Sequence, residues 1–186
     1  MKKILILSSN PIDTPRLRLD KEVREIEDGL QRSKNSNKFV IINKFAPRIK
    51  DIRRAILDNQ PSIIHFCGHG EKEGIIVEND DGTCYCLEID ALSDFFKLFS
   101  DFVECVLLNA CYTEKQAEAI SENISYVIGM SKGIADKDAI DFAVAFYDTL
   151  GSGKSYEFAF DVAKNAIELE NSYNKNSLPY PVLKKK

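Results

Sequence analysis

Residues 61–70 read PSIIHFCGHG, and this stretch directs both the fold and the search for a site. The apolar run at residues 63–67 predicts a short buried strand, which ends in Gly68-His69-Gly70 and not in a polar turn. Glycines on both sides of His69 leave room for the backbone of a ligand beside the imidazole. An open parallel sheet binds its ligands at this carboxyl edge of the strands. From this stretch alone, a ligand-binding histidine and a core histidine at a glycine-rich turn remain equally open.

Strand-like and helix-like segments alternate along nearly the whole chain, and an excursion follows Gly70. The excursion has the pattern of a hairpin with an Asp-Gly turn, and the tail is expected to add an edge strand because its prolines do not suit a central one. The alternation predicts an α/β fold: a mostly parallel central sheet with helices on both faces and a small hairpin. The expected strands are residues 3–7, 39–45, 63–67, 103–108 and 126–130, with an edge strand within 174–186. The expected hairpin pairs residues 74–77 with 84–87. The expected helices are residues 18–30, a helix beginning at Pro47, residues 89–99, a helix from Glu114, residues 137–150 and residues 155–169.

The length and charge of the chain limit the classes of function. With 186 residues, a single domain over residues 1–186 is expected. A formal net charge of -4 argues against a surface for nucleic acid or for an anionic membrane. The one basic run, residues 184–186, is interpreted as a solvated end.

No apolar segment is long enough to span a membrane, and the apolar start at residues 4–7 is too short for a signal peptide. Five cysteines, an odd number, fit reduced thiols better than a disulfide framework. The sequence therefore predicts a soluble cytoplasmic protein.

A second candidate residue lies at the end of the next long strand. Cys111 follows the apolar residues 103–108 by three positions, so His69 and Cys111 meet across one crevice if the two strands are neighbours. Thr113 and Gln116 have the spacing of a capping box, which predicts a helix beginning just after the cysteine. The amino terminus of such a helix and a nearby imidazole favour a thiolate, as a nucleophile requires. The backbone amides of Gly70 and Cys111 are the natural pair to bind an oxyanion.

These motifs resemble a known group of enzymes. The stretch HFCGHG at residues 65–70 and Asn109-Ala110-Cys111 after the following strand look like the caspase-hemoglobinase clan of cysteine peptidases, and specifically its CHAT subgroup. The resemblance extends over most of the chain, and its further matches are residues 127–130, Asp136 ahead of the helix with Phe142 and Tyr147, residues 151–155 and residues 181–183.

The resemblance implies a caspase-like three-layer sandwich and a role for each motif residue. His69 is the implied general base and acid, Cys111 the nucleophile that forms an acyl-enzyme, and Gly70 an oxyanion-hole donor. Tyr112-Thr113 departs from the caspase pattern after the cysteine, so aspartate specificity is not implied. CHAT and separase relatives tend to cut after basic residues, which requires an acid in the specificity pocket. Asp136 is the first candidate for that acid and Asp138 the second, although each also fits an ordinary helix cap.

Two other kinds of site, a metal site and a phosphate-binding loop, fit the sequence less well. His65, Cys67 and His69 share a face that Cys84 and Cys86 could join, but zinc sites favour tighter cysteine pairs. His65 is instead expected to be a structural histidine bonded to backbone. Residues 151–155, GSGKS, lack the earlier glycine of a phosphate-binding loop and follow a helix, so they predict a turn between two helices.

The sequence thus predicts a cysteine endopeptidase with a His69 and Cys111 dyad and no metal or other cofactor. A protein is the expected substrate, and a backbone carbonyl is expected to orient the imidazole. A regulatory or sensor protein on another chain is the expected activator, in bacterial defence or programmed death. The alternative is a recruitment module that keeps the caspase-like fold as a protein-binding surface, with an intact dyad held misaligned.

Overall fold

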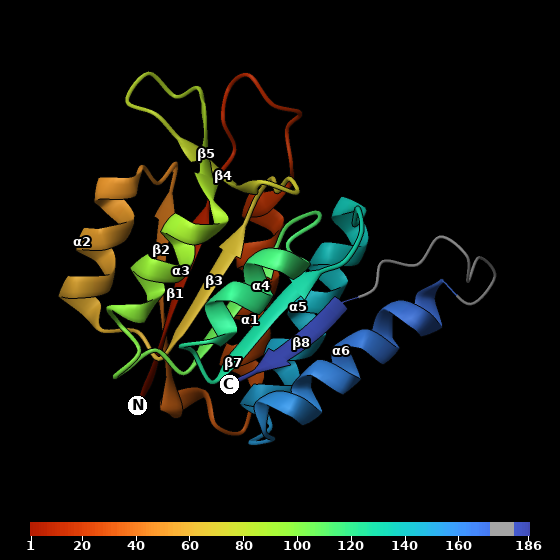
Figure 1. Cartoon of the computed structure of the whole chain (residues 1–186). Coiled ribbons are helices and arrows are strands. Elements are labelled where there is room, and N and C mark those ends of the chain that lie inside the picture. Colours follow the sequence, from red (N-terminus) through yellow and green to blue (C-terminus); the bar gives the residue numbers. More distant parts are fainter. Residues whose placement is uncertain (172–180) are drawn as a thin grey trace.

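The central feature of the fold is a six-stranded sheet (Figure 1). The structure is a computed structural model, and it describes residues 1–171 and 181–186. Neighbouring strands are parallel except for the last pair, β7 and β8, which are antiparallel. In order across the sheet the strands are β2 (Phe39–Phe45), β1 (Lys2–Ser8), β3 (Ile63–Cys67), β6 (Cys105–Asn109), β7 (Tyr126–Met130) and β8 (Pro181–Lys185).

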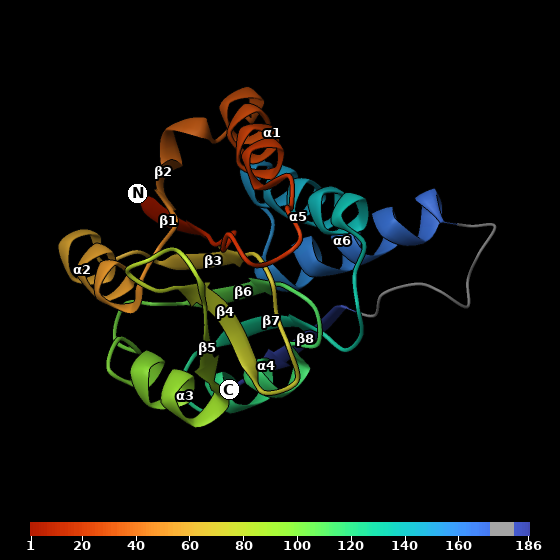
Figure 2. The same cartoon turned by 90° about the horizontal axis from the view of Figure 1, so that it is seen from above.

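Helices cover both faces of this sheet, so that the molecule has three layers when viewed from above (Figure 2). Strands β1, β3 and β6 are buried on both faces, which explains why they consist of continuous apolar runs and not of alternating residues. On one face lie α1 (Leu19–Arg32), α5 (Asp136–Gly151) and α6 (Tyr156–Glu170); on the other lie α2 (Ile49–Asn59), α3 (Ile89–Lys97) and α4 (Glu114–Ser121).

Each face has its own hydrophobic core. Alternate side chains of one strand enter different cores: Ile4 and Ile6 of β1 pack with α1, α5 and α6, whereas Leu5 and Leu7 pack with α2 and the elements near it. The first core is rich in aromatic residues, because Phe142, Phe146, Tyr147, Tyr156 and Phe160 project from α5 and α6 into it.

A two-stranded hairpin, β4 (Gly74–Glu78) and β5 (Cys84–Glu88), stands apart from the main sheet beside the loop that follows β1 (Figure 1). The amide of Ile76 donates to the carbonyl of His69 over 3.0 Å, and the amide of Ile12 donates to the carbonyl of Gly82 over 3.0 Å. The hairpin therefore connects the end of β3 with the loop after β1.

The predicted fold class is confirmed, including the hairpin and the turn between α5 and α6. The predicted edge strand is also confirmed for the part that lies within residues 181–185, whereas residues 174–180 of the predicted tail lie outside the described residues. Two details differ. Helix α2 begins at Ile49, because Arg48 occupies the cap position and the helix excludes Pro47. The prediction of a solvated basic end was wrong for Lys184. This residue lies in β8 and forms an ion pair with Glu114 over 3.3 Å.

Within residues 1–171 and 181–186, no helix is both long enough and apolar enough to cross a bilayer.

Replacing Phe146 tests the core between the sheet and α5. Its side chain is completely buried, so Phe146→Ala leaves a cavity and should lower the free energy of unfolding by about 3–5 kcal/mol. Urea denaturation followed by circular dichroism measures the change. The matched control is Leu57→Ala on α2, where the side chain is 57% exposed and the expected change stays within about 0.5 kcal/mol. Equal changes in the two variants would contradict the assignment of this core.

Candidate active site

The parallel pairing of β3 with β6 brings the two candidate motifs together. Cys67 pairs with Asn109 in the register of these strands, and His69 and Cys111 each lie two residues beyond that pair. The strand ends approach so closely that a Cβ atom on Gly70 would come within 3.0 Å of the Cys111 carbonyl oxygen. Only glycine fits at position 70 without displacing the turn that carries the cysteine.

The imidazole of His69 is held by a backbone carbonyl, as predicted. Its Nε2 atom lies 2.7 Å from the carbonyl oxygen of Pro15 in the loop after β1. A carbonyl oxygen can only accept, so Nε2 must carry a proton in this contact. In the neutral ring Nδ1 is then unprotonated and able to accept a proton.

The thiol of Cys111 lies against a second loop, between β7 and α5. The Ile134 amide donates to the sulfur over 3.3 Å, and the Ile134 carbonyl oxygen is 3.7 Å from it. The next residue, Tyr112, has a φ angle of 58°, a left-handed conformation that is costly for a residue with a side chain. This sharp turn separates the end of β6 from α4 and leaves Cys111 partly exposed.

The helix after Cys111 begins at Glu114, as predicted, but the predicted capping box is wrong. The Thr113 hydroxyl lies 2.9 Å from the Ala110 carbonyl oxygen and accepts from the Met130 amide over 2.9 Å. The Gln116 side chain donates to the backbone carbonyl of Glu71 over 2.7 Å. Thr113 therefore joins the turn after β6 to β7, and Gln116 joins α4 to the loop after β3, so that neither side chain caps α4.

The backbone amides of Gly70 and Cys111 donate to no acceptor within the described part of the chain. Most amides in a folded protein have a partner, and these two lie at adjoining strand ends. Geometrically they are available to an oxygen atom placed between them, which is the arrangement of an oxyanion hole.

The two acids proposed for a specificity pocket have different surroundings. Asp136 accepts hydrogen bonds from Arg18, from Nε over 2.6 Å and from the backbone amide over 3.3 Å. Asp138 accepts from the Asn171 side chain over 3.0 Å. Neither carboxylate caps α5 through a side-chain hydrogen bond. Asp136 lies two residues beyond the Ile134 contact to Cys111, and Arg18 lies three beyond the Pro15 contact to His69, so this ion pair joins the two loops that hold the candidate dyad.

A buried polar network lies behind the site and corrects the expectation for His65. Among the described residues its hydrogen-bond partner is a side chain and not the backbone: Nδ1 is 3.2 Å from the Tyr147 hydroxyl. Its Nε2 atom lies 3.0 Å from a Glu22 carboxylate oxygen, but without the geometry of a hydrogen bond. The same carboxylate oxygen accepts from Asn109 over 2.6 Å, and Asn109 also donates to the Ala139 carbonyl over 2.9 Å. The network joins α1, β3, β6 and α5 in the layer directly below His69 and Cys111.

One trio in this region has metal-ligand atoms. Glu22, His65 and Cys67 each offer one, all within 4.8 Å of one another, and all three residues are buried. Burial raises the pKa of the Cys67 thiol well above its usual range, so the sulfur is a neutral thiol beside the Ser8 hydroxyl at 3.2 Å. Zinc binds the thiolate, and Glu22 is already engaged with Asn109. The arrangement therefore fits a hydrogen-bonded interior network better than a metal centre.

Several residues of the site give no side-chain signal in the sequence. Pro15 and Ile134 act through backbone groups, which no residue type reveals. Glu22 did leave a signal, because it lies three residues after Leu19 on the apolar face of α1, where a carboxylate is out of place.

Comparison with known proteins gives one curated relative, whereas no family model matches the chain. The relative is a protein of Gillisia limnaea named "Probable protease". It is 28% identical over 177 residues, which are 92% of this chain and 31% of the relative. The chain thus spans about a third of that protein's length.

The solved structures that share the fold include three cysteine proteases. The secreted C11 cysteine protease of Bacteroides thetaiotaomicron has a TM-score of 0.63 at 12% identity, covering 91% of this chain and 59% of its own. Gingipain R, an Arg-specific cysteine proteinase, has a TM-score of 0.62 at 12% identity, covering 93% of this chain and 43% of its own. The Drosophila initiator caspase Dronc has a TM-score of 0.60 at 11% identity, covering 98% of this chain and 79% of its own. The sandwich described above is therefore caspase-like.

The contact with Pro15 predicts the tautomer of His69. In the neutral state the proton should reside on Nε2, with Nδ1 free, because a carbonyl can only accept. Long-range proton–nitrogen correlation spectra distinguish the two nitrogens, and the chain has only two histidines, so His69→Ala identifies the signals by their loss. A ring with its proton on Nδ1 would contradict this geometry.

Proposed function

We propose that the chain is a peptidase unit of the CHAT type, a cysteine endopeptidase that uses His69 and Cys111 to cleave proteins. One arrangement carries the proposal: the two residues lie at equivalent positions beyond paired strands, next to two amides with no acceptor among the described residues. The caspase-like fold and the relative named as a probable protease support the same reading.

In the proposed reaction Nδ1 of His69 accepts the proton of the Cys111 thiol as the sulfur attacks the scissile carbonyl carbon. The carbonyl oxygen becomes an oxyanion and accepts hydrogen bonds from the amides of Gly70 and Cys111. The carbonyl of Pro15 keeps the imidazole oriented throughout, because it accepts from the nitrogen that does not exchange the proton.

Collapse of the tetrahedral intermediate completes the first half of the reaction. The bond between the carbonyl carbon and the leaving nitrogen breaks, and the imidazolium of His69 gives its proton to that nitrogen. The acyl group remains on the Cys111 sulfur as a thioester. Water, deprotonated by the same imidazole, then attacks the thioester and releases the acid, which restores the thiol.

A preference for basic residues before the cut bond is part of the proposal. Asp136 directly follows the loop whose Ile134 contacts Cys111. Its side chain is 27% exposed and already binds the guanidinium of Arg18. A carboxylate in this position suits an arginine or lysine of the substrate, which would exchange with Arg18. The Arg-specific gingipain, which shares the fold, is consistent with this preference. Asp138 is the second candidate.

Activation by a partner protein completes the proposal. No hydrogen bond joins His69 to Cys111 among the described residues, since each is engaged by a separate loop. A partner that shifts these loops would bring the imidazole and the thiol into contact. Bacterial defence or programmed death is the proposed setting.

The separate loop contacts of His69 and Cys111 also favour a second candidate function, a recruitment module. Loop contacts that keep the imidazole and thiol apart at all times would leave the fold as a protein-binding surface without catalysis. Covalent labelling separates the two functions.

A peptidyl electrophile with arginine or lysine at the cleavage position should label Cys111 and should require His69. Because His69→Ala removes the general base, it should lower the labelling rate by about 100-fold or more. Cys111→Ala removes the nucleophile and should abolish labelling. Intact-protein mass spectrometry and peptide mapping measure the adduct, with and without candidate partner proteins. Labelling that is equal in the wild type and in His69→Ala, or absent under every activating condition, would favour the recruitment module.

The identity of the specificity acid is tested with paired probes. Asp136→Asn removes the charge that attracts a basic residue, so labelling by the arginine probe should fall about tenfold relative to an aspartate probe. Asp138→Asn is the matched control on the same turn of α5. If Asp138→Asn alone changes the ratio, the pocket belongs to the second acid; if neither does, the basic preference is wrong.

A further inference from the structure

A surface depression lies between α2, α3 and the β4–β5 hairpin, on the face opposite to α1 and α5. It has an apolar part of about 220 Å³, whose lining includes Phe66 of the sheet, Phe95 of α3 and Leu87 of the hairpin. A polar part of about 360 Å³ adjoins it, and the two share Ile49 and Tyr85. These two shared side chains are 42% and 44% exposed, so the rim presents apolar surface to solvent.

We call the apolar and polar parts together the hairpin groove. Three basic side chains, Arg48, Lys50 and Arg53, line its polar part together with two acids, Glu78 and Asp80. The lining therefore has an excess of one positive charge in a chain whose net charge is -4, and this excess rises to two when Asp80 leaves the groove. Arg53 forms no ion pair within the described residues, so its charge is available to a ligand.

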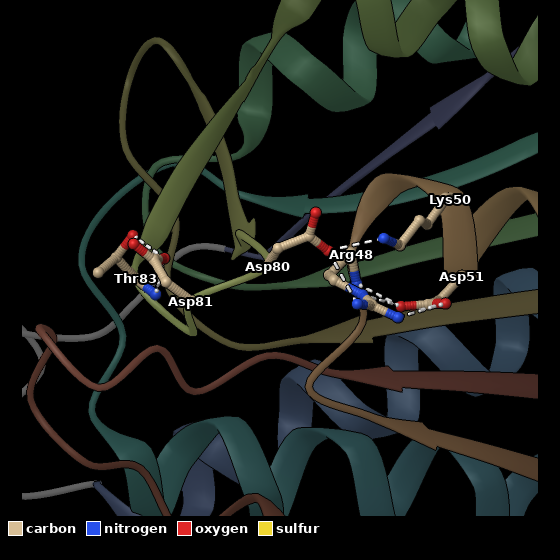
Figure 3. Close-up of polar contacts among 6 residues, drawn as sticks. All are labelled: Arg48, Lys50, Asp51, Asp80, Asp81 and Thr83. Atoms are coloured by element: carbon tan, nitrogen blue, oxygen red, sulfur yellow. Dashed lines mark hydrogen bonds and ion pairs between the residues drawn. The ribbon is translucent and has the colours of Figure 1, made fainter.

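Asp80 of the hairpin turn lines the polar part of the groove and points toward Arg48 and Lys50 (Figure 3). Asp80 binds Arg48 over 2.8 Å and Lys50 over 2.7 Å, while Arg48 also binds Asp51 over 2.6 Å. These hydrogen bonds hold the pKa of the Asp80 carboxyl below its usual range. The Asp80 side chain is 75% exposed, and exposed ion pairs contribute little free energy, so another carboxylate can replace it.

The hairpin is bonded both to the backbone of the candidate catalytic histidine and to the loop that holds its ring. Directly, Ile76 donates to the His69 carbonyl over 3.0 Å. Indirectly, the hairpin holds the loop that carries the Pro15 carbonyl: Cys84 donates its amide to the Asp13 carboxylate over 2.8 Å, and the Glu78 carboxylate accepts from the Asn10 amide over 3.2 Å. A displacement of the hairpin turn is therefore transmitted to both the backbone and the ring acceptor of His69.

We propose that the hairpin groove is the docking surface of the activating partner, and that its occupant is a peptide segment with an apolar side chain flanked by carboxylates. The apolar side chain enters the cavity beside Ile49 and Tyr85, and a carboxylate takes the place of Asp80 on Arg48 and Lys50. Release of Asp80 frees the hairpin turn from α2 and lets the loop after β1 reposition His69. This inference rests on the proposed function for its consequence at His69, but not for the binding itself.

A random peptide display library, selected on the full chain, tests the docking surface. Selected peptides should be enriched in Asp or Glu on either side of Leu, Phe or Met, and their recovery should fall at high salt because the contacts are ionic. Counter-selection uses the double variant Ile49→Ser, Arg53→Glu, whose folding is checked by thermal melting. Enrichment that is the same on this variant, enrichment of basic sequences, or no enrichment on the wild type would overturn the proposal.

The Asp80 contact is tested with the best selected peptide, made synthetically with a fluorophore. Asp80→Asn removes the internal competitor and should tighten binding by about threefold in fluorescence anisotropy, whereas Arg53→Gln should weaken it by about threefold. Arg32→Gln, at the end of α1, is the charge-matched control and should leave binding unchanged. Binding that ignores both Asp80→Asn and Arg53→Gln would overturn the site.

The two proposals can fail separately. Groove-dependent binding without any labelling of Cys111 would support the docking surface and contradict the peptidase. Labelling of Cys111 that requires His69, with no groove-dependent binding, would support the peptidase and overturn the docking surface. If both proposals hold, the bound peptide and Asp80→Asn should each change the rate of Cys111 labelling by the basic probe.

Discussion

The parallel register between β3 and β6 is the constraint on which the site depends. Because Cys67 lies opposite Asn109, each strand delivers its candidate residue two positions later to the same edge of the sheet. The strands themselves are fixed by burial, since both are covered on both faces and a shift of one residue would turn apolar side chains toward the wrong core. The close approach at Gly70 follows from that register, because the chain there passes against the carbonyl of Cys111.

Buried polar groups hold the surroundings of the site in place. The Glu22 carboxylate accepts a hydrogen bond from Asn109 and lies 3.0 Å from His65 Nε2, so α1 contacts both central strands through it. The loop that precedes α1 carries the Pro15 carbonyl, and the loop that precedes α5 carries the Ile134 amide. Leaving the buried Glu22 carboxylate without its Asn109 donor costs about 1–3 kcal/mol, so this hydrogen bond favours one position for α1 relative to the sheet. It adds specificity to a core whose apolar residues would tolerate small shifts.

The contacts to His69 and Cys111 come mainly from backbone groups of two loops, and this has a consequence for control. A side chain held by a backbone carbonyl or amide moves when the loop moves, without any change in sequence near the dyad. One loop is bonded to the hairpin, and the Arg18–Asp136 pair joins it to the other. The candidate site is thus connected to surfaces on both sides of the sheet by a small number of exposed interactions, which are individually weak and readily exchanged.

Sequence pattern was sufficient for the fold. Apolar runs predicted β2, β3 and β7 with their observed bounds and β1, β4, β5 and β6 to within two residues, since burial leaves a strong local signal. The residue types in GHG and NAC likewise indicated His69 and Cys111 as the candidate pair. The capping box at Thr113 and the backbone partner of His65 were wrong, because local spacing cannot show that Met130 or Tyr147, distant in the chain, binds these side chains instead. The partners of His69 and Cys111 were also decided only by the tertiary structure: Pro15 and Ile134 act through main-chain atoms, which every residue type possesses, so only the packing of the loops determines which of them reach the site.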